Sequence, residues 1–323
     1  MLTNSFPAPP FDTELKVVLD LVSQSIPATL TLADLPALRG PGFTPLLPEL
    51  LAGRAITHEE RTISGPLGAP DLIVSIFRPS NGITGGPAFF FTHVGGMVFG
   101  DRFVGISTII DYVELLNAVI VTVEYRLAPE NPAPAALEDS YAALLWTAAH
   151  ADELGFDPTR LIVAGASAGG GLAAGLALLS RDKGFPALAG QMLLWPMLDM
   201  RNNTVSSQQV DGIGVWDHAS NEMGWTALLG DRRLTGDVTV YESPSLESEP
   251  VGLPPAYLEV GSVEVFRDET VSYASALWRV GGTAELHVWP GGYHLFELLA
   301  PESALAIESR ATRNAWVVRN FSA

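Results

Sequence analysis

The sequence predicts an α/β protein in which helices cover both faces of a mostly parallel, eight-stranded sheet. Short apolar runs alternate along the chain with segments of helical periodicity, the order that produces parallel strands joined by crossover helices. The runs 88–92 (AFFFT) and 118–124 (AVIVTVE) are mostly apolar, as expected of strands that are buried on both faces. At 323 residues and 47% hydrophobic content, the chain is long and apolar enough for one large core.

Each expected element rests on its own pattern. Residues 55–63 and 72–78 alternate in polarity, which predicts antiparallel strands at an edge of the sheet. Asp217 is a suitable N-cap for a helix that ends at Leu229. The expected strands are 55–63, 72–78, 88–92, 118–124, the run that leads into Ser167, 191–195, 256–260 and 284–289. The expected helices are 13–22, one that ends at 113–116, 134–150, 172–179, 217–229, 268–280 and 301–318.

The segment 161–171, LIVAGASAGGG, has the form of a nucleophile elbow. An apolar, β-branched run leads into Gly-x-Ser-x-Gly, and a run of small residues with helical character follows. A serine at such a turn has a strained backbone, and Gly165 and Gly169 have no Cβ to clash where strand and helix cross. The turn exposes the hydroxyl and directs the N-terminus of the helix toward developing negative charge. The motif therefore predicts Ser167 as a nucleophile.

A nucleophilic serine needs a general base, and His294 is the best placed of the six histidines. It lies in the glycine-rich loop 290–294, directly after the last expected strand. In a parallel sheet this loop emerges at the same carboxyl edge as the elbow. His287 lies within a strand and His150 at the end of a helix, so both are expected to be structural.

The base in turn needs a carboxylate that orients its imidazole. The loop after the strand 256–260 offers Glu264, Asp268 and Glu269. Glu264 is nearest the end of the strand and is the preferred acid. Asp268 is the alternative, although it also suits the first turn of the next helix. Asp199, which follows the preceding strand, is a third candidate.

An acyl-transfer site also needs backbone N–H groups that bind the oxyanion. Ala168, directly after the nucleophile, is one expected donor, and others are expected from the glycine-rich loop 93–100, HVGGMVFG. His93 is expected to hydrogen-bond within this loop. The expected lining of an apolar substrate pocket is Val94, Met97, Val98, Phe99 and Trp216, with Trp195, Met200 and Trp225 as further candidates.

Together these residues resemble the hormone-sensitive-lipase-like branch of the α/β-hydrolase fold, a group of bacterial and fungal carboxylesterases. The matching motifs are His93-Val94-Gly95-Gly96, the segment 124–130 (EYRLAPE), Gly165-Ala166-Ser167-Ala168-Gly169-Gly170, and the tail from Glu264 to His294. The resemblance covers most of residues 55–320. It implies an α/β-hydrolase fold with a helical cap. It assigns Ser167 as the nucleophile, His294 as the base and a residue of the acid loop, with Glu264 preferred over Asp268, as the third member of a catalytic triad. The oxyanion hole that it implies consists of Gly95, Gly96 and Ala168.

The resemblance also implies how the chain divides. Residues 1–50 and 200–235 would form two cap segments, and residues 51–199 and 236–323 the catalytic core.

Two positions depart from the family pattern. Val94 replaces the first glycine of HGGG and narrows the entrance to the oxyanion hole. Glu264-Val265-Phe266 replaces Asp-Pro-Leu, and the longer glutamate requires a loop that lies slightly further from His294.

The implied activity is that of a serine carboxylesterase, a carboxylic ester hydrolase of class EC 3.1.1.-. It would hydrolyse neutral short- to medium-chain esters through an acyl-enzyme, with no metal and no organic cofactor. A lactonase or amidase with the same triad is an alternative, since the same site opens cyclic esters. A non-catalytic, ligand-binding receptor on the same scaffold is an alternative of another class, which the presence of His294 disfavours.

Composition limits the partners and the location. The formal charge of −18 opposes binding to nucleic acid and anionic membranes, so the expected partner is a small-molecule ester. The absence of cysteine excludes disulfides, thiolate catalysis and cysteine-ligated metal, and fits a reducing, cytoplasmic location. No apolar stretch reaches the ~18 residues of a membrane span. The sequence leaves the oligomeric state open, with a homodimer among the assemblies considered.

Overall fold

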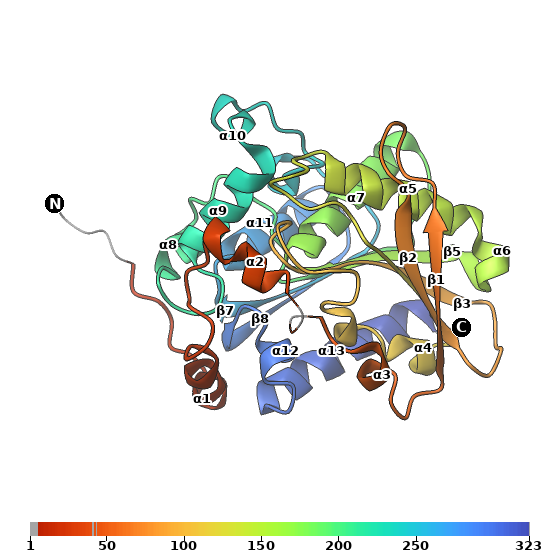
Figure 1. Cartoon of the computed structure of the whole chain (residues 1–323), viewed down its shortest axis with the longest axis horizontal. Coiled ribbons are helices and arrows are strands. Elements are labelled where there is room, and N and C mark those ends of the chain that lie inside the picture. The colour runs from red at the N-terminus through yellow and green to blue at the C-terminus, as the bar shows by residue number, and fades with distance from the viewer. Residues whose placement is uncertain (1–5, 41, 43, 323) are drawn as a thin grey trace.

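The computed structural model describes residues 6–40, 42 and 44–322, and it contains one eight-stranded sheet with helices on both faces (Figure 1). The strand order is β1-β2-β4-β3-β5-β6-β7-β8. β2 pairs antiparallel with β1 and with β4, and the other neighbours are parallel. The strands are β1 (Ile56–Ile63), β2 (Leu72–Pro79), β3 (Gly86–Thr92), β4 (Val119–Val123), β5 (Phe156–Ala166), β6 (Gly190–Leu194), β7 (Ala256–Val263) and β8 (Ala284–Tyr293). The mostly parallel sheet predicted from the sequence is confirmed.

Most predicted helices begin and end within three residues of their predicted bounds, but α7 extends four residues beyond the prediction at each end, and several helices of four or five residues were not predicted. α1 has the predicted bounds, and the carboxylate of Asp217 accepts the N–H of Ser220 at 2.8 Å as the N-cap of α9. The α-helices are α1 (Thr13–Val22), α2 (Leu35–Leu38), α3 (Leu47–Leu50), α4 (Tyr112–Leu115), α5 (Ala135–Ala149), α6 (Ala151–Leu154), α7 (Ala168–Lys183), α8 (Val205–Gln209), α9 (His218–Leu229), α10 (Arg232–Thr235), α11 (Arg267–Arg279), α12 (Phe296–Leu299) and α13 (Ala304–Phe321). Short 3-10 turns are Leu32–Asp34, Ile106–Thr108 and Pro244–Leu246.

The continuous apolar strands supply two separate cores, one on each face of the sheet. On β3, Phe90 packs in the core that includes α5, α7 and α11, whereas Phe89 and Phe91 pack with α4 and α13 on the other face. All three side chains are fully buried. Because neighbouring residues of a strand point to opposite faces, a strand between two helical layers buries its side chains on both faces.

β3 begins two residues before its predicted start and β7 ends three residues after its predicted end, and two further strands differ in their pairing. β2 is not an edge strand, because it pairs with β1 on one side and with β4 on the other. β8 does not end at Trp289 but continues to Tyr293, where it pairs with Val263 of β7. The segment 290–293 contains proline and two glycines, so its side-chain pattern does not reveal that its backbone is paired.

The N-terminal segment and residues 200–235 lie outside the sheet and contact each other. The N–H of Leu30 donates to Oγ of Ser220 on α9 at 2.8 Å. The N-terminal segment also contacts the sheet, since the N–H of Asp12 donates to the carbonyl of Gly291 on β8 at 3.1 Å. The predicted cap segment 1–50 includes residues 1–5, 41 and 43, which lie outside the described part of the chain. Within the described residues, no helix is both long and apolar enough to span a membrane.

Candidate functional site

The turn between β5 and α7 has the geometry that the Gly-x-Ser-x-Gly motif predicts. Ser167 has a φ of 56°, a left-handed conformation that costs a residue with a side chain on the order of 1–3 kcal/mol. A Cβ at Gly165 would lie 2.1 Å from the carbonyl oxygen of Gly169, and a Cβ at Gly169 would lie 2.0 Å from the carbonyl oxygen of Thr92. The close crossing of strand and helix therefore admits only glycine at both positions.

A hydrogen-bonded line joins a hydroxyl, an imidazole and a carboxylate. Oγ of Ser167 lies 2.9 Å from Nε2 of His294, and Nδ1 of His294 lies 2.6 Å from Oε1 of Glu264. A carboxylate only accepts, so the ring proton belongs on Nδ1 and Nε2 is left to accept the hydroxyl proton. The three side chains are 3%, 4% and 1% exposed, which strengthens their electrostatic coupling.

The three side chains meet because they follow parallel strands of the same sheet. Ser167 follows β5, Glu264 follows β7, and His294 follows β8. The carboxyl ends of parallel strands lie at one edge, where the connecting loops converge. The second carboxylate oxygen of Glu264 accepts the N–H of Gly261 at 3.0 Å, which fixes the acid against the end of its own strand.

The other two candidate acids have different partners. Asp268 accepts the N–H of Ser206 at 2.8 Å and so links α11 to α8. Asp199 is held by Arg201, with 2.6 Å between Nη2 and Oδ2. Among the three candidates, the structure places Glu264 against the imidazole.

Gly95 and Gly96 line the same cavity as Ser167, and Ala168 follows Ser167 at the start of α7. Gly95 and Gly96 have φ values of 127° and 60°, which residues with a side chain seldom adopt. A Cβ at Gly95 would lie 1.9 Å from the carbonyl oxygen of Phe99, and a Cβ at Gly96 would lie 2.4 Å from the indole of Trp216. Ala168 is the first residue of α7, so its N–H has no intrahelical acceptor. These groups can hold an oxyanion if one forms beside Ser167.

Buried side chains hold the loop that carries these glycines in place. Nδ1 of His93 lies 2.7 Å from the carbonyl oxygen of Val94, so this histidine hydrogen-bonds within the loop as expected. The ring of Tyr125 stacks on His93 at 3.9 Å, and its hydroxyl donates to the His93 carbonyl at 2.9 Å. Burial lowers the pKa of His93, which keeps this imidazole neutral. Next to Tyr125, the guanidinium of Arg126 donates to both oxygens of the buried Asp139 and anchors the turn.

Ser167 and His294 open into an apolar cavity of about 170 Å³. Of the pocket residues predicted from the sequence, Val94, Phe99 and Trp216 line this cavity. Met97 and Val98 do not. The remaining lining is Val22, Ile26, Leu30, Gly95, Gly96, Val104, Val215, Leu295, Leu298 and Leu299. Leu295, Leu298 and Leu299 follow His294 at helical spacing, a signal that was available in the sequence.

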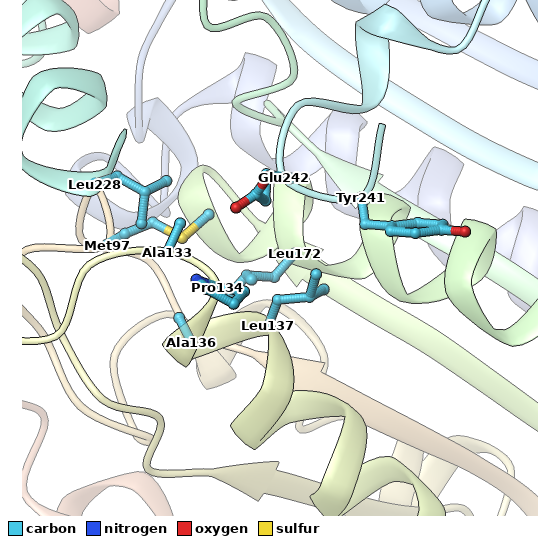
Figure 2. A pocket seen from close by; sticks show the side chains of 10 residues that line it. Met97, Ala133, Pro134, Ala136, Leu137, Leu172, Leu228, Tyr241 and Glu242 are labelled. Carbon is cyan, nitrogen blue, oxygen red and sulfur yellow. The ribbon is translucent and has the colours of Figure 1, made fainter. Parts of the chain in front are cut away.

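Met97 lines a second, much smaller hollow of about 10 Å³ (Figure 2). Leu137, Leu172 and Leu228 surround it there, and Glu242 lies at its border. A volume of this size holds at most one water molecule. Val98 is fully buried in the core on the α7 side of the sheet.

Comparisons with known proteins agree with this geometry. A family model described as alpha/beta hydrolase fold matches residues 89–298. Carboxylesterase NlhH of Mycobacterium tuberculosis is 33% identical over 314 residues, which cover 92% of this chain and 93% of the relative.

Solved structures show the same likeness. A bacterial heroin esterase superimposes on this chain with a TM-score of 0.87 at 34% sequence identity. The match covers 97% of this chain and 98% of the esterase chain. A thermostable esterase from Pseudomonas putida superimposes with a TM-score of 0.83 at 30% identity, over 98% of this chain and 100% of its own.

Proposed function

Because this chain belongs to the hormone-sensitive-lipase-like carboxylesterases of the α/β-hydrolase fold, we propose that it hydrolyses neutral, short- to medium-chain esters through an acyl-enzyme on Ser167. The chain is a carboxylic ester hydrolase, as its relatives along almost the whole length are. The roles of single residues and the size of the substrate are our proposal. The observation that carries it is the hydrogen-bonded line from Ser167 through His294 to Glu264.

In the proposed reaction, Oγ of Ser167 attacks the ester carbonyl while Nε2 of His294 takes its proton. Glu264 accepts the hydrogen bond from Nδ1–H of His294 and stabilises the imidazolium that forms. The N–H groups of Gly95, Gly96 and Ala168 bind the tetrahedral oxyanion. The imidazolium then gives its proton to the leaving alcohol. Water, activated by the same imidazole, hydrolyses the acyl-enzyme and restores the serine.

The cavity supports a limit on substrate size and charge. A dry apolar cavity of roughly 150 Å³ accommodates a ligand the size of benzene. The cavity beside Ser167 is about 170 Å³, and its described lining contains no Asp, Glu, Lys or Arg. An ionised group would lose its hydration there without gaining a partner. A neutral ester whose buried group is a short alkyl chain or one small ring suits this cavity.

We propose that residues 1–50 and 200–235 form the cap over this cavity, with residues 51–199 and 236–323 as the catalytic core. Val22, Ile26 and Leu30 of the first segment and Trp216 of the second line the cavity together with residues of the core. Because both segments contribute walls, their packing against each other helps to set the space left for the substrate.

Activity toward p-nitrophenyl esters tests the proposal, with Ser180→Ala as the matched control. Ser180 is a buried serine on the same helix, α7, and lies away from the elbow. We expect Ser167→Ala to fold, to lose labelling by a fluorophosphonate and to lose about 10⁴–10⁶ in kcat. Ser180→Ala should retain both properties. Native turnover by Ser167→Ala would contradict the assignment of the nucleophile.

A panel of esters from acetate to decanoate, together with simple lactones, tests the substrate class. We expect kcat/KM to be highest among the shorter acyl chains and to fall once the chain outgrows the cavity. A maximum at decanoate would contradict the proposed size limit. Faster turnover of lactones than of linear esters would instead favour the lactonase alternative.

A further inference from the structure

A buried ionic cluster surrounds Arg313 of α13. Nη1 of Arg313 donates to Oε1 of Glu259 at 2.5 Å and to Oε2 of Glu297 at 2.8 Å, and Nη2 donates to the other oxygen of Glu297. Arg313 and Glu259 are fully buried, and Glu297 is 3% exposed. One guanidinium therefore joins two carboxylates that come from different elements, β7 and α12.

This cluster contacts the chain on both sides of the proposed base. Glu297 lies three residues after His294, at the centre of α12. Glu259 lies on β7, five residues before Glu264. Oε2 of Glu259 also accepts the indole N–H of Trp289, which lies on β8 five residues before His294. The buried ionic cluster therefore binds the strand that leads to Glu264 and the chain both before and after His294.

The segment after His294 needs such support. Leu295 has a φ of 65°, and α12 is a single turn of four residues. A turn this short is not stable by itself, and a left-handed leucine adds strain. Leu298 and Leu299 line the apolar cavity, whereas Glu297 binds Arg313 of the neighbouring helix α13 (Figure 1). α12 is therefore held between the cavity and α13.

Stability alone does not account for the cluster. Removing charges from water costs about as much as their attraction returns, so a buried ion pair is weak evidence for stability. Here two carboxylates share one guanidinium, and burial raises the pKa of Glu297 even though Arg313 opposes that shift. What a buried polar network does provide is one defined arrangement of the elements that it joins.

We infer that Arg313 is a positioning residue for ester hydrolysis: by binding Glu297 and Glu259 together, it holds His294 in line with Ser167. The inference rests on the triad proposed above. The hydrogen bonds of the Arg313 side chain go to Glu259 and Glu297 and not to the three triad side chains, so it acts through the backbone that follows His294. A misplacement of about 1 Å at a reacting group can cost roughly 100-fold in rate.

Glu297→Leu tests this inference, because it leaves Arg313 and Glu259 as a balanced pair and frees α12. We expect the variant to fold and to lose about 10–100-fold in kcat on p-nitrophenyl acetate, with little change in KM. Glu297→Gln, which keeps an oxygen that can accept from Arg313, should recover most of this loss. Val317→Ala is the control: Val317 is a fully buried apolar residue of α13, so its truncation lowers the melting temperature without altering kcat.

Arg313→Lys provides the same test if Glu297→Leu does not fold. Lysine keeps the buried charge but lacks the fork that binds two carboxylates, so we expect about a tenfold loss of kcat. Native kcat in either folded variant would overturn the inference. So would an equal loss of kcat in Val317→Ala, since that result would reduce the effect to stability. Ser167→Ala is measured alongside: if it is inactive while Glu297→Leu is native, only the positioning role fails.

Discussion

Nδ1 of His294 lies 2.6 Å from Oε1 of Glu264, although the glutamate is one methylene longer than the aspartate of the family motif. The extra length is accommodated because the second oxygen of the carboxylate binds back to the N–H of Gly261 at 3.0 Å. The side chain therefore spans the space between the end of β7 and the imidazole with both oxygens satisfied.

Glu264→Gln is expected to fold and to lose about 10³–10⁴ in kcat, because an amide cannot hold the Nδ1 tautomer or stabilise the imidazolium. Asp268→Asn is the matched comparison, since Asp268 binds Ser206 of α8. It should keep native kcat on the same p-nitrophenyl ester. A large loss in Asp268→Asn combined with an active Glu264→Gln would exchange the two assignments.

Trp216→Ala is expected to shift the acyl preference toward longer chains. The indole lies against Gly96 and forms part of the cavity wall, so its removal opens space beside Ser167. We expect the ratio of kcat/KM for hexanoate to that for acetate to rise about tenfold, the scale of a hydrophobic pocket contact. Met97→Ala should leave this ratio unchanged, because it enlarges the separate hollow of Figure 2. Equal shifts in the two variants would contradict this division of the pocket.

Thr29→Val is expected to loosen the two proposed cap segments. The hydroxyl of Thr29 donates to the buried Asp217, and the next N–H, of Leu30, donates to Ser220. Hydrogen bonds from the described residues 16–38 to residues beyond 50 all involve Asp217 or Ser220. We expect urea unfolding to show a loss of about 1–2 kcal/mol, and KM to rise because Leu30 lines the cavity.

Thr31→Val provides the control for the cap. The hydroxyl of Thr31 binds Asp34 within the same exposed turn and does not reach α9. Its removal should leave KM at the native value. If both valine variants change KM alike, the link between Thr29 and Asp217 does not set the shape of the cavity.

Glu269→Gln is expected to change how stability depends on pH. Burial raises the pKa of Glu269 well above its ordinary value, and its Oε1 accepts the N–H of Leu198 at 2.6 Å. The folded state therefore keeps a proton that the unfolded state loses above a pH of about 4.3, so the free energy of unfolding falls as pH rises through the interval between the two pKa values. Urea unfolding from pH ~5 to ~9 should show this fall in the native protein and a flatter profile in Glu269→Gln. Parallel profiles would contradict the raised pKa.

The chain order and the local patterns were sufficient to predict much of this molecule. Continuous apolar strands indicated a sheet covered on both faces, since strand geometry alternates side chains between two cores. The glycines around Ser167 indicated a close crossing of strand and helix, because only glycine fits where carbonyl oxygens lie about 2 Å from a would-be Cβ. These features depend on residues that are neighbours in sequence, so the pattern itself contains the information.

Tertiary structure alone decided which distant groups share the site. Glu264 and Asp268 are four residues apart and both follow β7, but the turn into α11 directs one toward His294 and the other toward Ser206. The cavity wall depends in the same way on the packing of the N-terminal segment, which brings Ile26 and Leu30 to the same cavity as Ser167. Contacts between segments far apart in the chain follow from how whole elements pack, and the composition of either segment does not specify its partner.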